Sequence, residues 1–355
     1  MKKISIEMSQ NILLDQTINS FFERSIEYAT RLDPSYRQLW EVLYGLIRSG
    51  GKRLRPKMTL MAYDAFGGTE TNKIVPIAAA QELLHFSLLI HDDVIDRDYV
   101  RYGVSNIAGR YKIAYSQYIT LAEDQTHYAH SAAILAGDLM LSGAHQLIAS
   151  SELNDQQKMV AQRYLSTSVF EVACGELLDT ELSFTPYTSG DALKVAKYKT
   201  ASYSFVSPLL TGASLAGIDH HKAEALRSFG ESLGIAYQLV DDLLGVFGSE
   251  SEIGKSTSSD IIEGKRTYMV EFALTSLTEN EKSVFMHAFG NSNVTALEVE
   301  NIRQLLEKSG ARSATEQKID EYVKSALDSL AQLELEQHHY DKFASFVNKV
   351  IERSS

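Results

Sequence analysis

Residues 81–103, QELLHFSLLIHDDVIDRDYVRYG, carry the most informative pattern in the chain. Apolar residues recur there at spacings of three and four, which predicts a helix. Asp92 and Asp96 are four residues apart and share one face of that helix, with Asp93 beside them and His85 two turns earlier. Three carboxylates within one turn repel each other unless a cation compensates. The cluster is therefore either a solvated helix end or a site where hard divalent cations such as magnesium bind oxygen ligands.

A second acidic pair follows another apolar run. In YQLVDD, residues 237–242, Asp241 and Asp242 lie within a second helix that the periodicity predicts. Two such pairs in one chain favour a metal site over two solvated helix ends. If the two helices face each other, their five carboxylates would hold a cluster of magnesium ions that bridges phosphate groups.

Basic residues accompany glycine and hydroxyl residues in three places. Lys52, Arg53 and Arg55 follow a glycine pair in SGGKRLRP, which suits an anion site or a basic surface patch at a helix end. Lys199 precedes Thr200 at the start of a charge-free stretch, and alone it would be an ordinary amphipathic lysine. Residues 245–265, GVFGSESEIGKSTSSDIIEGK, have the composition of a mobile lid over phosphates or of a surface loop.

The overall composition narrows the possible functions. The 355 residues include 34 Lys or Arg and 46 Asp or Glu, and the resulting net charge of −12 argues against nucleic acid as a partner. The single cysteine, Cys174, excludes a disulfide framework and a cysteine-rich zinc site. No apolar run follows the lysines of MKKISIEMSQ, so no signal peptide is expected. Residues 200–218 lack charge but carry hydroxyl groups, proline and glycine, which favours a buried helix over a transmembrane segment. We therefore expect a soluble cytoplasmic protein.

Helical periodicity continues along most of the chain, and the alternation typical of strands is scarce. No linker or short repeat divides the sequence. We therefore predict an all-α fold, with residues 1–355 forming a single domain of roughly ten to fifteen helices. The expected helices are residues 12–31, 36–47, 57–66, 74–93, 130–150, 155–177, 191–215, 221–247 and 268–277, with two or three more over residues 296–308 and 314–353.

The motifs occur in an order that resembles the trans-isoprenyl diphosphate synthases. The order is GGKRLRP, HxxxxxxDDxxD with Arg101 and Gly103 after it, GD at residues 137–138, KT at 199–200, QxxDD, and GK twice. The resemblance covers residues 39–270. DDLLGVFG and the long segment before SAAILAGD are most similar to the bacterial geranylgeranyl diphosphate synthases. The resemblance implies a helical bundle around a deep central cavity, a homodimer, and magnesium as the only cofactor.

The resemblance also implies a role for each matching residue. The diphosphate of isopentenyl diphosphate would be bound by Lys52, Arg55 and His85. Two magnesium ions would be bound by Asp92 and Asp96, and a third by Asp241. The allylic diphosphate would be bound by those ions together with Arg101, Lys199 and Lys255, and its surroundings completed by Thr200, Gln238 and Lys265. The implied reaction is head-to-tail elongation, in which the double bond of isopentenyl diphosphate attacks an allylic carbocation inside an apolar cavity.

Product length and two departures follow from the same comparison. Ser87 and Leu88 precede Asp92 by five and four residues, where family members with short products tend to carry an aromatic residue. The small Ser87 therefore predicts a longer product, geranylgeranyl diphosphate. Tyr102 stands where the family commonly has a second arginine, which Arg53 or Arg97 would have to replace. Gly245 stands where the second acidic motif usually ends in aspartate.

Two rival functions remain to be weighed. A class I terpene cyclase also uses DDxxD, but its second metal motif needs a hydroxyl residue and a glutamate where this chain has Gly245 and Ser249. A non-catalytic subunit of a heteromeric prenyl diphosphate synthase is the other alternative, and the departures at Tyr102 and Gly245 favour it. The joint presence of the acidic and basic motifs favours a catalytic chain.

Overall fold

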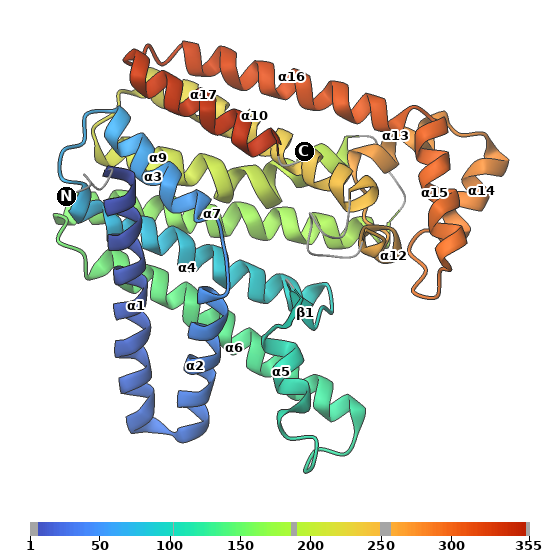
Figure 1. Ribbon diagram of the computed structural model, residues 1–355, viewed down its shortest axis with the longest axis horizontal. Helices are drawn as coiled ribbons and strands as arrows, with labels where there is room; N and C mark the ends of the chain where they lie inside the picture. Colours follow the sequence, from blue (N-terminus) through green and yellow to red (C-terminus); the bar gives the residue numbers. More distant parts are fainter. Residues whose placement is uncertain (1–5, 102, 186–189, 249–256, 353–355) are drawn as a thin grey trace. The chain divides into compact units, whose positions relative to one another are not determined.

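The computed structural model describes residues 6–101, 103–185, 190–248 and 257–352 (Figure 1). Within these ranges the regular secondary structure is helical except for one short two-stranded hairpin, so the predicted all-α fold is confirmed. Contacts divide the chain into two compact units, Met1–Leu165 with Thr211–Gly217, and Ser166–Leu210 with Ile218–Ser355. The prediction of a single domain over residues 1–355 stays a prediction.

The first unit is organised around helix α4, Thr71–Ile95. The other elements of this unit are α1 (Ile6–Leu32), α2 (Pro34–Arg48), α3 (Leu54–Ala65), β1 (Val100–Arg101), β2 (Val104–Ser105), α5 (Ile107–Ala114), α6 (Ala122–Ala149) and the start of α7 (Asp155–Leu182). Helix α4 packs against α6, α3 and α1. Small and aliphatic residues at positions 77–80 of α4 are fully buried. The close approach of α6 depends on Gly137, where an added Cβ would lie within 2.7 Å of the His91 ring.

The second unit is organised around helix α10, His220–Phe247, which packs against η1 and α16. Its other elements are the end of α7, α8 (Asp191–Val195), the π-helix η1 (Ala196–Val206), the start of α9 (Ser207–Leu215), α12 (Ser259–Glu263), α13 (Tyr268–Ser276), α14 (Glu279–Ala288), α15 (Ala296–Lys308), α16 (Ala311–Ala331) and α17 (Gln337–Ile351). The helix predicted over residues 191–215 is therefore divided by the π-helix Ala196–Val206, which contains Lys199 and Thr200. Short helices α5, α12 and α14 were not predicted.

Local capping explains where several helices begin. The Asp33 carboxylate accepts hydrogen bonds from the Ser35 and Tyr36 backbone amides, and Pro34 occupies the first turn, so α2 begins at Pro34 rather than Tyr36. Thr278 and Thr295 each form a capping box, which starts α14 and α15.

Two helices, α4 and α6, are long and apolar enough to cross a membrane by length and composition alone. In their most apolar windows 67% of α4 and 50% of α6 are buried inside the protein, as expected of core helices. The predicted burial of the charge-free stretch is confirmed, because residues 200–213 are buried.

Arg53 and Glu82 form a buried ion pair that ties α3 to α4. Arg53 Nη1 donates to Glu82 Oε1 at 2.8 Å, and Arg53 Nη2 donates to the Ile47 carbonyl at 2.9 Å. The two side chains are only 17% and 6% exposed. Arg53 has left-handed backbone, with φ of 50°, just before α3 begins. This residue is therefore a structural part of the basic motif.

Removing one partner of that pair leaves the other charge buried. We expect Glu82→Ala to lower the free energy of unfolding by about 3 kcal/mol or more. The control is Glu41→Ala, which removes the solvent-exposed Arg37–Glu41 pair and should cost no more than about 0.5 kcal/mol. Urea unfolding of both variants measures the difference. Equal losses in the two variants would contradict a buried, structural role for Glu82.

Candidate active site

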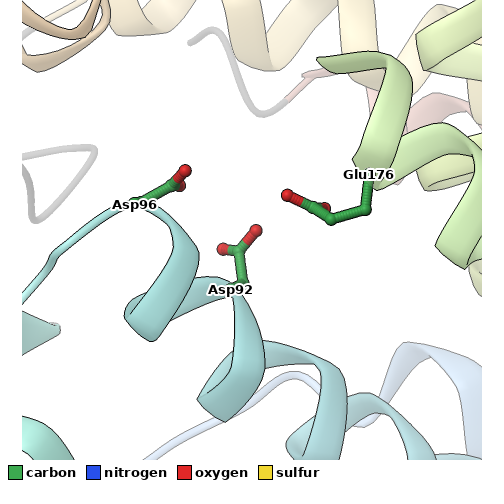
Figure 2. A group of neighbouring side chains, drawn as sticks. All are labelled: Asp92, Asp96 and Glu176. Carbon is green, nitrogen blue, oxygen red and sulfur yellow. The ribbon is translucent and has the colours of Figure 1, made fainter. Parts of the chain in front are cut away.

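The first acidic motif lies at the C-terminal end of α4. Asp92 and Asp96 are partly buried and extend from one face of the last turn (Figure 2). A carboxylate oxygen of each lies within 4.8 Å of one from the other. The Asp96 amide donates to the Asp92 carbonyl at 2.8 Å, so the backbone fixes their relative position. The predicted common face is therefore present, and it offers a pair of hard oxygen donors.

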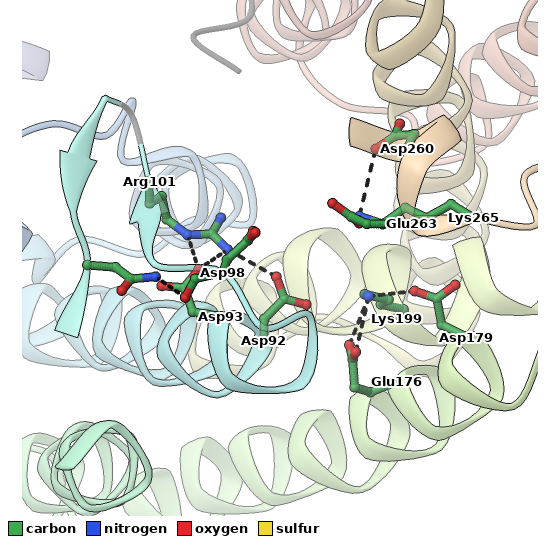
Figure 3. Close-up of polar contacts among 11 residues, drawn as sticks. Asp92, Asp93, Asp98, Arg101, Glu176, Asp179, Lys199, Asp260, Glu263 and Lys265 are labelled. Atoms are coloured by element: carbon green, nitrogen blue, oxygen red, sulfur yellow. Dashed lines mark hydrogen bonds and ion pairs between the residues drawn. The ribbon is translucent and has the colours of Figure 1, made fainter. Parts of the chain in front are cut away.

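The first strand of a short hairpin carries Arg101, which contacts this acidic motif. Strands β1 and β2 pair Val100 with Ser105 and Arg101 with Val104. Arg101 Nε donates to Asp93 Oδ1 at 2.7 Å, and Arg101 Nη2 donates to Asp92 Oδ2 at 3.1 Å (Figure 3). The repulsion between Asp92 and Asp93 is thus offset by a guanidinium group from the same unit.

Asp93 is the buried member of the motif. It is 5% exposed, and this burial raises its pKa to about 6. The Arg101 guanidinium opposes the rise, while the negative charges of Asp92 and Asp98 add to it. The sequence pattern counted Asp93 among the five carboxylates of a magnesium cluster, whereas in the structure it is buried and paired with Arg101.

His85 is a partly buried residue of the first unit that is influenced by three arginine side chains. Burial lowers the pKa of the His85 imidazole well below its usual value, and the positive charges of Arg55, Arg101 and Arg53 lower it further. Arg55 is partly buried and Lys52 is exposed. Of the two replacements considered for the missing arginine, Arg53 is engaged with Glu82, and Arg97 is exposed. Tyr102 lies outside the described residues.

Lys199 is held by two carboxylates of α7 in the second unit. Its ammonium group donates to Asp179 Oδ2 at 2.6 Å and to Glu176 Oε1 at 3.2 Å (Figure 3). Glu176 and Asp179 were missed by the sequence analysis. Their spacing of three residues on a helix was a usable signal, because it places them on one face.

A chain of hydrogen bonds links η1 to the second acidic motif. Thr200 Oγ1 donates to Gln238 Oε1 at 2.5 Å, and Gln238 Nε2 donates to Asp242 Oδ1 at 2.8 Å. Burial raises the pKa of Asp242 well above its usual value. Gln238 opposes this rise, and the charges of Asp260, Asp241 and Asp179 add to it. Asp241 itself is exposed on α10.

The segment after the second acidic motif explains the glycine at position 245. A Cβ added at Gly245 would overlap Asp260 Oδ2 and lie 3.1 Å from its Cγ. The Asp260 carboxylate thus fills the space that a side chain at position 245 would need. Lys265 lies 3.1 Å from Glu263 Oε2 and 3.8 Å from Asp260 Oδ1 (Figure 3). Lys255 and the rest of residues 249–256 of the proposed lid lie outside the described residues.

Comparison with known proteins identifies the family. Residues 37–307 match the family described as Polyprenyl synthetase. The chain belongs to this family. It is 31% identical over 299 residues to the geranylgeranyl diphosphate synthase of Sulfolobus acidocaldarius, which covers 83% of this chain and 84% of that protein. It is also 30% identical over 315 residues to heptaprenyl diphosphate synthase component 2 of Bacillus subtilis, covering 87% and 80% of the two chains.

A solved structure shares the whole fold. The geranylgeranyl pyrophosphate synthase of Corynebacterium glutamicum, crystallised with isoprenyl diphosphate and magnesium, matches with a TM-score of 0.90 and 27% identity. The match covers 97% of this chain and 98% of that one. The resemblance and reaction class predicted from the motifs are thereby confirmed: this polyprenyl synthetase is a trans-prenyltransferase that elongates prenyl chains.

The pKa of Asp93 predicts how stability depends on pH once divalent metal has been removed with EDTA. Between about pH 4 and pH 6, Asp93 stays protonated in the folded protein and is ionised in the unfolded chain. Its contribution therefore makes stability fall as pH rises through this window, by up to about 3 kcal/mol. Asp93→Asn remains neutral, so its unfolding free energy should fall less steeply between pH 4 and pH 6. Parallel pH profiles from urea unfolding of the two proteins would contradict the raised pKa.

Proposed function

We propose that this polyprenyl synthetase is a magnesium-dependent enzyme that joins isopentenyl diphosphate to an allylic diphosphate. The proposal rests chiefly on Asp92 and Asp96, whose carboxylates share one face at the end of α4 with Arg101 beside them. Carboxylate oxygens in this arrangement suit magnesium, which is commonly bound through one or two carboxylates together with phosphate oxygens. Asp241, exposed on α10, would hold a third ion, as the family resemblance implies. When bound, magnesium would stabilise the negative charge on the departing diphosphate.

The cationic side chains would bind and orient the two diphosphates. Arg101 and Lys199 would serve the allylic diphosphate, together with Lys255 and Lys265. Lys52 and Arg55 would serve isopentenyl diphosphate. Because its pKa is lowered, His85 is neutral near pH 7 and would donate a hydrogen bond rather than supply a charge.

The hydrogen bonds between η1 and α10 would orient the allylic end of the reaction. Gln238 accepts from Thr200 and donates to Asp242, which fixes its amide group. With its proton directed to Gln238, the Thr200 hydroxyl would present its lone pairs to a developing carbocation. Apolar side chains around the carbocation would exclude water from it.

We further propose that the enzyme works in the cytoplasm as a homodimer and that its product is geranylgeranyl diphosphate. Relatives that bear the name geranylgeranyl diphosphate synthase support the product. The alternative is a subunit that needs a second, different chain, and similarity to component 2 of a heptaprenyl diphosphate synthase is the observation that favours it.

Loss of Asp92 should separate chemistry from folding. We expect Asp92→Ala to lower turnover at least about 100-fold, because it removes a carboxylate that would hold the magnesium needed to stabilise the leaving charge. Its melting temperature should stay close to that of the unmodified protein. Asp98→Asn is the matched control, since it removes a nearby negative charge and should retain activity. Steady-state assays at several magnesium concentrations provide the measurement, and near-normal turnover of Asp92→Ala would refute the metal assignment.

The burial of Ser87 changes which residue we propose to limit product length. Ser87 is 1% exposed and its hydroxyl donates to the Gly137 carbonyl at 2.8 Å, so it packs between α4 and α6. Leu88 is partly exposed. Leu88, rather than Ser87, is therefore the better candidate for limiting the chain.

Substitutions at these two positions test that revision. Leu88→Phe should shift the main product toward farnesyl diphosphate at unchanged magnesium dependence. Ser87→Phe should instead lose about 1–3 kcal/mol of stability through overpacking. Chromatography of the prenyl alcohols after phosphatase treatment separates the products. If Leu88→Phe is active and makes an unaltered product, the growing chain follows another path.

A further inference from the structure

Helix α7 lies close against the backbone of η1 at Gly175, one residue before Glu176. A Cβ added at Gly175 would overlap the backbone nitrogen of Lys199 and lie 2.6 Å from both Lys199 Cα and Tyr198 C. All three atoms belong to the backbone of η1, so no side-chain rotation would relieve the overlap. Only glycine at this position allows the two helices their observed separation.

This close approach coincides with the ion pairs of Lys199. Glu176 follows Gly175 directly and Asp179 lies one turn further along α7, and both carboxylates contact the Lys199 ammonium group. The three side chains are each about one-fifth exposed, at 19–21%. The position of the ammonium group is thus set by the depth at which η1 lies against α7.

The opposite side of η1 is fixed by a second glycine. A Cβ added at Gly234 of α10 would lie 2.5 Å from Ala201 Cα and 2.5 Å from Ala201 Cβ. Ala201 is two residues from Lys199, and residues at this spacing lie on different sides of a helix. Movement of η1 away from α7 would therefore press it against α10, so the segment around Lys199 has little freedom to shift.

We propose that Gly175 is a positioning residue that places Lys199 for the allylic diphosphate. The proposal rests on the proposed function, because it takes Lys199 as a diphosphate-binding group. A larger residue at position 175 would displace the Lys199 backbone and move the ammonium group from the position that Glu176 and Asp179 define. Misplacement of a binding group by about 1 Å is enough to cost about 100-fold in rate.

The central test is a double-mutant cycle between Gly175→Ala and Lys199→Ala, read out by binding. The probe is the S-thiolo analogue of geranyl diphosphate, which does not ionise, with magnesium present, and calorimetry gives its Kd. Gly175→Ala should weaken binding about tenfold or more and raise the KM for the allylic substrate, with the KM for isopentenyl diphosphate unchanged. In the Lys199→Ala background the same substitution should have almost no further effect, because the group it displaces is gone.

Two further variants keep the test decisive. Asp179→Asn leaves the backbone unaltered and removes one partner of Lys199, so it should also weaken binding and be non-additive with Lys199→Ala, even if Gly175→Ala does not fold. Gly143→Ala, which would crowd the Phe21 ring in the first unit, is the packing control and should combine additively with Lys199→Ala. Additivity of Gly175→Ala with Lys199→Ala would overturn the inference, as would additivity of Asp179→Asn with Lys199→Ala if Gly175→Ala does not fold. Failure of the unmodified protein to bind the analogue would instead overturn the proposed function.

Discussion

The repulsion between crowded carboxylates is the constraint on which the rest of this structure depends. A chain with a net charge of −12 gathers acidic side chains at the ends of α4 and α7 and on α12, where their mutual repulsion opposes close packing of the chain. Each group is offset by a cation from its own unit. Arg101 lies against Asp92 and Asp93, Lys199 against Glu176 and Asp179, and Lys265 against Glu263 and Asp260. Three of the cations proposed to bind diphosphate, Arg101, Lys199 and Lys265, therefore also offset the charge of acidic groups.

Local backbone features place these cations beside the carboxylates. Arg101 lies on β1, the first strand of the short hairpin that follows α4, and contacts Asp92 and Asp93 from there. Lys199 reaches the α7 carboxylates because Gly175 lets η1 approach closely. Lys265 follows the short helix α12, whose Asp260 fills the space left open by Gly245. In each case a small residue or a short element accommodates the position of a charged side chain.

Local patterns predicted the long elements well, and long-range contacts account for what they missed. Helix α15 occupies the predicted residues Ala296–Lys308, because it carries both its apolar face and its capping box in sequence. The pairing of Asp92 with Asp96 was equally local. By contrast, the sequence pattern treated Arg53 as a candidate anion-binding cation, whereas Glu82, twenty-nine residues away, holds it. The contact of Ser87 was equally invisible to local pattern, because its partner is the Gly137 carbonyl of α6. The π-helical turns of η1 depend on packing against α7 and α10, which periodicity does not record.

The most direct test of the account is an assay of the purified chain alone, with magnesium, isopentenyl diphosphate and radiolabelled farnesyl diphosphate, in which products are resolved by length. We predict one principal product, geranylgeranyl diphosphate, with one pyrophosphate released per condensation. EDTA should abolish product formation. Product formation only after addition of a second, different subunit would contradict the claim that this chain holds a complete catalytic site.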